Sequence, residues 1–269
     1  MNQKANAIHV AVTKTAAMRY IAETAGHGYH LFQSGVVPAG KLLQLIQKFN
    51  DSYRVLATRG MRDNDRLRGR SCARLVLFPK VSFPEEKPER EWLFWLMATE
   101  GVGDLAKEKR TMDAREPASR LSWENQYTLV SRPVRRRNGE LDYVWTWVLQ
   151  ERFISRWHHA FKRAAGRVRS SRERKPDYLI KLLASLRRLP GFQGINRQKR
   201  AIIISADIPR HWHTELNLKL LGTVVNKSLP VFHPGRTVEN MLNCANPPPP
   251  SSPSQSGPTP FGGGPPPGP

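Results

Sequence analysis

Acidic residues are scarce in this chain of 269 residues, which has 22 Asp and Glu against 43 Lys and Arg and a formal net charge of +21. Such an excess raises repulsion within the folded protein and favours polyanionic partners, namely DNA, RNA or anionic lipid. The excess is uneven along the chain. Residues 1–84 carry +9 and residues 152–244 carry +14, whereas residues 85–151 carry −2 and residues 245–269 carry no charge. Two basic blocks therefore flank a near-neutral middle.

Cysteine is almost absent, since the chain holds Cys72 and Cys244 alone. Two distant cysteines exclude a CxxC-type zinc site and a disulfide-rich secreted scaffold. The chain also lacks the run of about 18 apolar residues that a membrane span needs, and its start lacks the apolar core of a signal peptide. No Walker loop or nucleophile elbow is present. These absences predict a cytoplasmic protein that uses no cofactor.

The composition changes at residue 245, where the chain begins to read ANPPPPSSPSQSGPTPFGGGPPPGP. This segment is rich in Pro, Gly and Ser, and it has too little apolar surface to offset the entropy that ordering would cost. The sequence therefore predicts a disordered tail over 245–269. It predicts one basic domain over 1–244, with a subdivision near 168–176.

Hydrophobic periodicity within residues 1–244 predicts both helices and strands. Apolar side chains three and four residues apart are typical of helices, whereas alternation or a short apolar run is typical of strands. WLFWLMA (residues 92–98) is apolar throughout, as in a central strand covered on both faces. These patterns predict an α+β fold in which an antiparallel meander of about four strands packs against several helices. The strands are expected at Cys72–Pro79, Glu91–Thr99, Tyr127–Val134 and Asp142–Leu149, the helices at 38–53, 151–167 and 177–189, and a further short buried strand at Ala201–Ser205 (AIIIS).

The last two strands of the meander are expected to form a hairpin around Asn138-Gly139. Asn-Gly is a favoured pair for a type I′ turn, whose twist suits a two-residue hairpin loop. This turn fixes the register and forms two cross-strand pairs of opposite charge. The expected pairs are Arg137–Glu140, Arg135–Asp142, Val134–Tyr143 and Val130–Trp147.

Three aromatic residues, Tyr143, Trp145 and Trp147, share one face of the second hairpin strand. Bases of a single-stranded nucleic acid could stack on such a face if it were open. A large aromatic stripe beside an amphipathic helix is usually core. We therefore expect these three side chains to pack in the core against the helix that follows.

The strongest functional signal is a row of basic residues on the helix expected at 151–167. At about 100° per residue, these residues fall on one narrow face, opposite the apolar face. A solvated helical face usually carries acids that pair with bases four residues away, and this row has none, so we expect it to contact phosphates. The expected nucleic-acid-binding residues on this helix and just beyond it are Arg152, Arg156, His159, Arg163, Arg167, Arg169 and Arg172.

Two further clusters of bases support the same expectation. The segment Arg54–Arg74 is predicted to be a basic loop, because Gly60 and Gly69 argue against one continuous helix. Arginine suits bidentate phosphate contacts better than lysine does, and such contacts give affinity and salt dependence without sequence specificity. The phosphate contacts expected from the loop and from a cluster before AIIIS are Arg62, Arg66, Arg68, Arg70, Arg197, Lys199 and Arg200.

The motif HWHTE places His211 and His213 two residues apart, so that both would lie on one face of a strand. This spacing resembles that of the metal-binding pair in rolling-circle nucleases. Pro209 and Arg210 interrupt the strand just before the pair, and a metal site needs more ligands than two histidines, which favours loop histidines. A metal-dependent nuclease or relaxase-like enzyme that uses His211 and His213 is the alternative to non-enzymatic binding.

The middle of the chain resembles a known group of proteins. Within residues 72–200, the order of CARLVLFP, EWLFWLMATEGVG, LSWENQYTLVSRP, YVWTWVLQERFISRW and LRRLPGFQGINRQ is similar to that in poorly characterised proteins of bacterial plasmids and integrative conjugative elements. The resemblance implies a cytoplasmic bacterial protein that handles the DNA of a mobile genetic element, and it implies no catalytic residue.

Together, the basic residues and this resemblance predict a nucleic-acid-binding accessory protein. DNA is the expected partner, and other proteins of the mobile element are further partners. A third interpretation is an adaptor whose basic surface meets an acidic protein or the inner membrane in a conjugation or secretion machine.

Overall fold

The structure of the protein, a computed structural model, describes residues 9–11, 13–80, 91–103, 111–170, 177–208 and 232–237. The tail expected at 245–269, the pair His211 and His213, and Arg172 lie outside these residues. Within them the fold is α+β, as predicted. The elements are β1 (His9–Ala11), α1 (Lys14–Gly26), β2 (Leu31–Pro38), α2 (Leu42–Tyr53), α3 (Arg59–Leu67), β3 (Ala73–Lys80), β4 (Glu91–Ala98), β5 (Met112–Asp113), β6 (Ser122–Trp123), β7 (Tyr127–Arg135), β8 (Leu141–Leu149), α5 (Glu151–Ser170), α6 (Asp177–Arg188), α7 (Gln193–Ala206) and β9 (Phe232–Thr237), with 3-10 turns at Ala39–Lys41 and Pro117–Ser119.

All four expected strands are present, but they lie in two sheets instead of one meander. β4 is central in a four-stranded antiparallel sheet of order β3-β4-β2-β5, whereas β7 and β8 belong to a three-stranded sheet of order β6-β7-β8. β2, which the sequence analysis did not predict, pairs with β4 along its whole length. The prediction lacked β2, because LFQSGVVP contains Gln, Ser, Gly and Pro and resembles a loop in composition.

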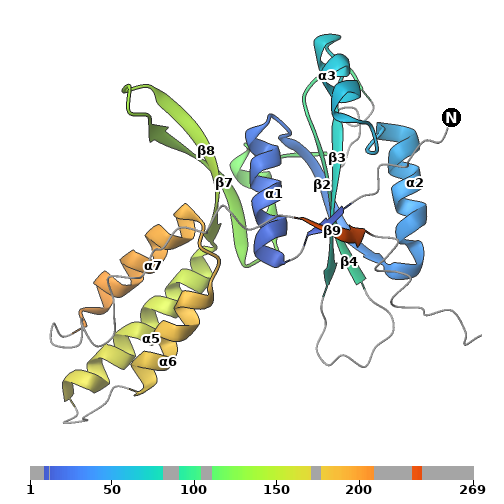
Figure 1. Cartoon of the computed structure of the whole chain (residues 1–269). Coiled ribbons are helices and arrows are strands. Elements are labelled where there is room, and N and C mark those ends of the chain that lie inside the picture. The colour runs from blue at the N-terminus through green and yellow to red at the C-terminus, as the bar shows by residue number, and fades with distance from the viewer. Residues whose placement is uncertain are drawn as a thin grey trace, which may run out of the picture.

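The two sheets and their helices form successive layers (Figure 1). Helix α1 lies between the three-stranded sheet and one face of the four-stranded sheet, and α2 covers the other face. Side chains of β4 alternate between these layers: Trp95 and Met97 enter the core beside α1, and Trp92 and Leu96 enter the core beside α2. One strand thus supplies both cores, which explains why WLFWLMA is apolar throughout.

A cluster of tryptophans joins the two sheets. Trp95 of β4 stacks on Trp123 of β6 with ring centroids 4.4 Å apart, and Trp123 meets the edge of Trp147 of β8 at 6.5 Å. The indole Nε1 of Trp147 donates a hydrogen bond of 2.7 Å to the carbonyl oxygen of Met18 in α1. Trp147 is therefore in the core, as expected, although its backbone partner comes from α1 and not from the helix that follows β8.

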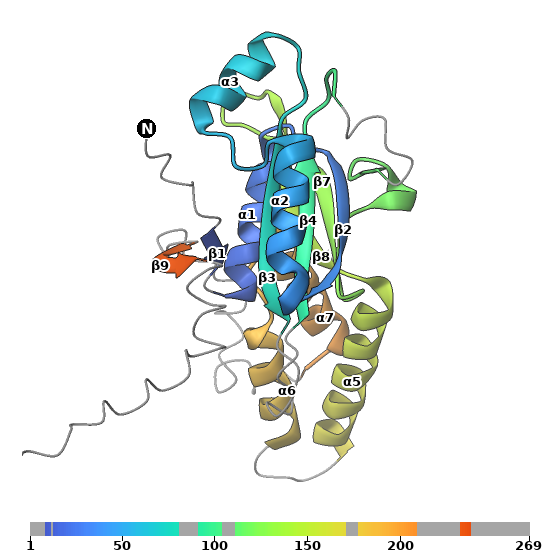
Figure 2. The same ribbon diagram turned by 90° about the vertical axis from the view of Figure 1, so that its right-hand side faces the viewer.

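Helices α5, α6 and α7 form a unit with a core of its own, at the opposite end of the molecule from α3 (Figures 1 and 2). The helices expected at 151–167 and 177–189 are confirmed. The strand expected at AIIIS is wrong, because this run lies inside α7. Ile202 is buried whereas Ile204 is 79% exposed, so the run faces different sides of a helix. A short apolar run does not distinguish a buried strand from a helix. Among the described residues, none of the helices combines the length and the apolar character needed to cross a membrane.

The expected hairpin between β7 and β8 is present, but its register is shifted by one residue. Arg136 N–H donates to the carbonyl of Glu140 (2.8 Å), and Gly139 N–H donates to the carbonyl of Arg136 (3.0 Å). Gly139 has a φ of 85°, whereas Asn138 has a negative φ, so the loop has three residues and ends in a left-handed glycine instead of forming a type I′ turn. The observed pairs are Leu129–Trp147, Val130–Thr146, Pro133–Tyr143, Val134–Asp142 and Arg135–Leu141.

A turn with positive φ at both central residues occurs one hairpin earlier, between β6 and β7. Its central residues are Glu124 (48°) and Asn125 (52°). Positive φ angles usually require glycine, and neither residue of this turn is one. Contacts from two helices stabilise the turn instead. Lys14 of α1 pairs with the Glu124 carboxylate at 2.7 Å, and the guanidinium of Arg152 in α5 donates to the Asn125 carbonyl at 2.6 Å.

The N-terminal half of α7 joins the helical unit to β8. Gly194 N–H donates to Oγ1 of Thr146 (3.1 Å), and a Cβ added at Gly194 would lie 2.5 Å from the carbonyl oxygen of Trp147. The side-chain amide of Gln198 accepts from the N–H of Leu149 (2.8 Å) and donates to its carbonyl (3.1 Å). Gln198 thereby makes the hydrogen bonds that a neighbouring strand would make, and α7 closes this end of the β8 edge.

The close approach of α7 to β8 leads to a prediction about two helical glycines. We expect Gly194→Ala to lower the free energy of unfolding by about 1–3 kcal/mol, because the new methyl group would overlap the β8 backbone. Gly166→Ala in α5 is the matched control: its Cβ would meet nothing within 4 Å, so the higher helix propensity of alanine should raise stability by about 0.5–1 kcal/mol. Urea unfolding measures both changes. Equal stabilisation by the two substitutions would show that α7 does not sit this close to β8.

Candidate nucleic-acid interface

Helix α5 has the two faces that the sequence predicts. Phe161, Ala164 and Ala165 are buried against α6 and α7. The basic residues lie on the other side of the helix and are all exposed. At about 1.5 Å per residue, they extend over about 22 Å of helix. These residues, named the α5 row below, are Arg152, Arg156, His159, Arg163 and Arg167.

Aromatic rings and a backbone carbonyl hold several guanidinium groups of the α5 row in place. Arg152 donates to a backbone carbonyl, and the guanidinium groups of Arg152 and Arg156 lie 4.9 and 5.6 Å from the ring centre of Phe153. The guanidinium of Arg167 lies 5.8 Å from the ring centre of Tyr178 in α6. Among the described residues, no carboxylate pairs with Arg156 or Arg163. The middle of the row therefore presents uncompensated positive charge.

Charge of the same sign covers the rest of the helical unit. Residues 151–170 and 177–208 contain 12 Lys and Arg against three acids, Glu151, Asp177 and Asp207. One acid is used within the unit, since Arg169 pairs with Asp207 at 2.9 Å. Arg169, expected to contact phosphate, is thus partly neutralised by the protein. Arg197 and Arg200 of α7 are exposed and add to the field of the unit.

Lys199 does not lie on the surface, contrary to the expectation that it contacts phosphate. It is 4% exposed, and its ammonium donates a hydrogen bond of 2.7 Å to the carbonyl of Leu189, just beyond the end of α6. The expectation placed this cluster before a strand at AIIIS, whereas the helical periodicity of α7 turns Lys199 inward between two exposed arginines. Burial lowers the pKa of Lys199 to about 8.

The basic segment after α2 contains a helix where a loop was expected. Helix α3 begins after Thr58, whose side chain accepts a hydrogen bond from Met61 N–H (3.3 Å), and it ends before Gly69, which has a φ of 69°. The two glycines therefore lie near the helix ends, where they interrupt it least. The segment is therefore not one long helix, in agreement with the prediction, but a short helix still carries Arg59, Arg62 and Arg66.

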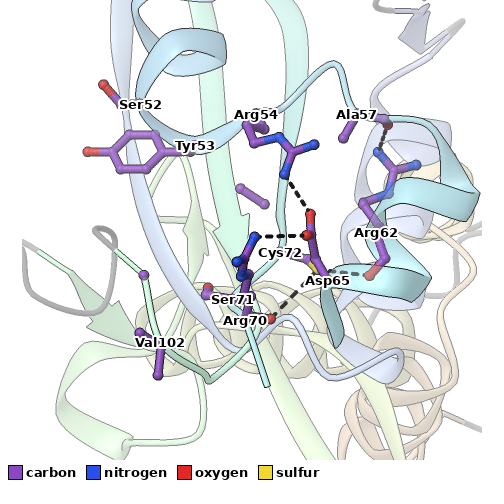
Figure 3. A pocket seen from close by; sticks show the side chains of 12 residues that line it. Ser52, Tyr53, Arg54, Ala57, Arg62, Asp65, Arg70, Ser71, Cys72 and Val102 are labelled. Carbon is purple, nitrogen blue, oxygen red and sulfur yellow. Dashed lines mark hydrogen bonds and ion pairs between the residues drawn. The ribbon is translucent and has the colours of Figure 1, made fainter. Parts of the chain in front are cut away.

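Two arginines of this segment meet one carboxylate in a pocket of about 180 Å³ (Figure 3). Asp65 of α3, whose side chain is 13% exposed, pairs with Arg54 at 3.0 Å and with Arg70 at 3.9 Å. Arg54 adopts a φ of 55° after the end of α2, and its side chain turns toward α3. These ion pairs attach α3 to the elements on either side of it.

Two more of the expected phosphate contacts in this segment bind backbone carbonyls of the protein. Arg62 donates to the carbonyl of Ala57. Arg66 donates to the carbonyl of His27 (2.9 Å), and its guanidinium lies 4.8 Å from the ring centre of Tyr29. Together with the pairs at Asp65, these contacts use most of the arginines to position α3. Arg68 is exposed, and no carboxylate pairs with it among the described residues.

The α5 row and the α3 arginines do not form one surface. In both views of the chain, α3 lies at one end of the sheets and α5 at the other (Figures 1 and 2). The structure therefore places the basic residues of α5 and α7 in one helical unit and separates them from the arginines around α3.

A basic surface that the sequence prediction missed lies on the outer half of the β7–β8 hairpin, residues 131–145, called the ribbon below. It extends away from the rest of the molecule (Figure 1). Tyr143, expected in the core, is 61% exposed, because the core ends near Trp145, which stacks on His30 at 5.4 Å. β7 and β8 have nine residues each, whereas β6 has only two, so most of the hairpin extends beyond the third strand. The exposed apolar and basic residues of the ribbon are Pro133, Leu141, Tyr143, Val144, Arg135, Arg136 and Arg137, and Arg132 is half-buried.

The buried ammonium of Lys199 predicts a pH dependence of stability. Its folded pKa of about 8 lies below the ordinary value of 10.5. Between these values the unfolded chain binds more protons than the folded protein, so stability rises with pH in this window. Relative to Lys199→Met, the wild type should gain stability as the pH rises from about 8 to about 10.5. Urea unfolding at several pH values measures the difference, with Lys181→Met as the control for loss of an exposed lysine. Parallel curves for wild type and Lys199→Met would contradict the prediction.

No family model, no curated protein and no solved structure matches this chain.

Proposed function

We propose that the protein binds nucleic acid, with duplex DNA as the first candidate, through the exposed face of α5. The observation that carries this proposal is the pair Arg156 and Arg163 in the middle of the α5 row. Both are exposed on one face of a rigid helix, and neither has a carboxylate partner among the described residues.

The physical argument concerns repulsion along the row. Like charges about one helical turn apart destabilise a helix by a few tenths of a kcal/mol per pair. Ion pairing would remove this cost, and the chain uses such pairs elsewhere, at Asp65 and at Asp207. A polyanion that releases its counterions on binding gives the row a favourable partner. The row spans about 22 Å, which matches about six base pairs of a duplex at 3.4 Å each.

The surroundings of the row support a partner with many phosphates. Arg197 and Arg200 lie on α7, which packs against α5, so the field of the whole helical unit has one sign. Binding of this kind is mainly electrostatic, and it tolerates many base sequences. An accessory role in handling the DNA of a mobile element agrees with such binding. The role itself stays a prediction, as do a nuclease based on His211 and His213 and an adaptor function.

Charge reversal on α5 tests the proposal. The variant Arg156→Glu/Arg163→Glu should bind duplex DNA at least about 100-fold more weakly than wild type, because two phosphate contacts become repulsive. Binding by wild type should weaken steeply with salt. Mobility shift or fluorescence anisotropy across a salt series measures both effects, with single-stranded DNA, RNA and anionic liposomes as comparison ligands.

The matched control carries the same change in net charge at the other end of the molecule. Arg59→Glu/Arg68→Glu alters two exposed arginines of the α3 segment, and we expect it to weaken binding only slightly. Equal losses in the two variants would mean that net charge alone drives binding. Absence of binding to any nucleic acid, or binding that salt does not weaken, would overturn the proposal.

A further inference from the structure

The ribbon is a two-stranded segment that leaves the layered part of the protein. The three-stranded sheet has the order β6-β7-β8, and β6 pairs only with Tyr127 and Thr128 of β7. Beyond these residues the hairpin continues as two strands to the turn at 137–139. An isolated two-stranded ribbon is at best marginally stable in water, so a projecting one indicates a use outside the folded core.

Apolar side chains are exposed along the ribbon. Leu141 is 59% exposed, Tyr143 is 61% exposed and Val144 is 40% exposed. Residues that lie directly opposite each other share a face of the ribbon. On one face Tyr143 lies opposite Pro133 and Leu141 lies opposite Arg135, so the apolar face that is core near Trp147 continues outward into solvent.

The charge of the ribbon indicates what covers this face. Arg136 pairs with Asp142 at 2.7 Å, and Asn138 donates to Glu140. The remaining bases, Arg132, Arg135 and Arg137, pair with no carboxylate among the described residues. A second copy of the chain would bring the same arginines together, and like charges would repel. A partner with both negative charge and apolar surface fits better.

We infer that the ribbon enters the major groove of the duplex whose backbone is bound by the α5 row. This inference rests on the proposed function. The major groove is about 12 Å wide and accepts a two-stranded β-ribbon. Thymine methyl groups offer apolar contacts for Leu141 and Tyr143, and phosphates and guanine edges offer acceptors for Arg135 on the same face and for Arg137 in the loop.

The chain connection makes simultaneous contact feasible. β8 ends at Leu149 and α5 begins at Glu151, so the ribbon and the α5 row diverge from one point. Both project from the same side of the four-stranded sheet (Figure 1). The α7 contacts at Thr146 and Leu149 anchor β8 at this point, which gives the two surfaces a fixed relation.

A double substitution on the ribbon tests the inference separately from the phosphate contacts. Leu141→Ser/Tyr143→Ser should weaken duplex binding about tenfold or more at every salt concentration, because it removes apolar contacts. The slope of log affinity against log salt should stay at the wild-type value, since that slope counts phosphate contacts. The control Leu67→Ser/Ile204→Ser changes side chains that are 88% and 79% exposed elsewhere and should bind as wild type does.

Groove competition gives an independent readout. Methyl green, a ligand of the major groove, should displace wild type from duplex DNA, whereas netropsin, a ligand of the minor groove, should not. Displacement by netropsin alone would overturn the inference.

The outcomes separate this inference from the proposed function. Wild-type binding that is lost in Arg156→Glu/Arg163→Glu but unchanged in Leu141→Ser/Tyr143→Ser overturns the inference and leaves the function standing. A dimer in sedimentation that becomes a monomer in Leu141→Ser/Tyr143→Ser, with unchanged DNA affinity, also overturns it. Wild type that binds no duplex overturns both.

Discussion

The arrangement of this protein depends on how β8 is held over its last four residues. The indole of Trp147 donates to the α1 backbone, the hydroxyl of Thr146 accepts from the start of α7, and the amide of Gln198 takes both backbone groups of Leu149. β8 is therefore fixed from one face, from the other face and along its edge. Both basic surfaces begin beside these contacts: the α5 row follows Leu149, and the ribbon ends at Trp145. Without these contacts the α5 row and the ribbon would have no fixed orientation relative to each other.

Arginine has different roles at the two ends of the molecule, and the difference lies in the partners available. Around α3, Asp65 and the carbonyls of Ala57 and His27 occupy arginine side chains, so positive charge contributes to structure. On α5, Arg156 and Arg163 face solvent opposite a buried apolar side, and no carboxylate reaches them among the described residues. Composition alone cannot separate these two cases, because it counts every arginine equally. It does not show whether the guanidinium contacts the protein or is free to bind a phosphate.

Sequence reasoning succeeded where structure is set by neighbours along the chain. The period of Phe161, Ala164 and Ala165 fixes the buried face of α5, and the α5 row follows from it by geometry. Prediction failed where distant residues decide. Lys199 is buried because α7 is helical through this segment and turns the ammonium toward the carbonyl of Leu189. Arg66 is occupied by the carbonyl of His27, 39 residues away. β2 was missed because pairing with β4, and not its own composition, makes it a strand.

The shifted hairpin shows how one local choice changes a surface. With a two-residue turn at Asn138-Gly139, Arg135 would lie opposite Asp142, and Arg136 would lie opposite Leu141. The three-residue loop places Arg135 opposite Leu141 and gives Asp142 to Arg136. One face then carries Arg135, Leu141 and Tyr143 together, with no acid among them. Because side chains alternate along a strand, a shift of one residue re-pairs every cross-strand neighbour. The left-handed glycine at the end of the loop therefore places Arg135, and not Arg136, opposite Leu141 on this face.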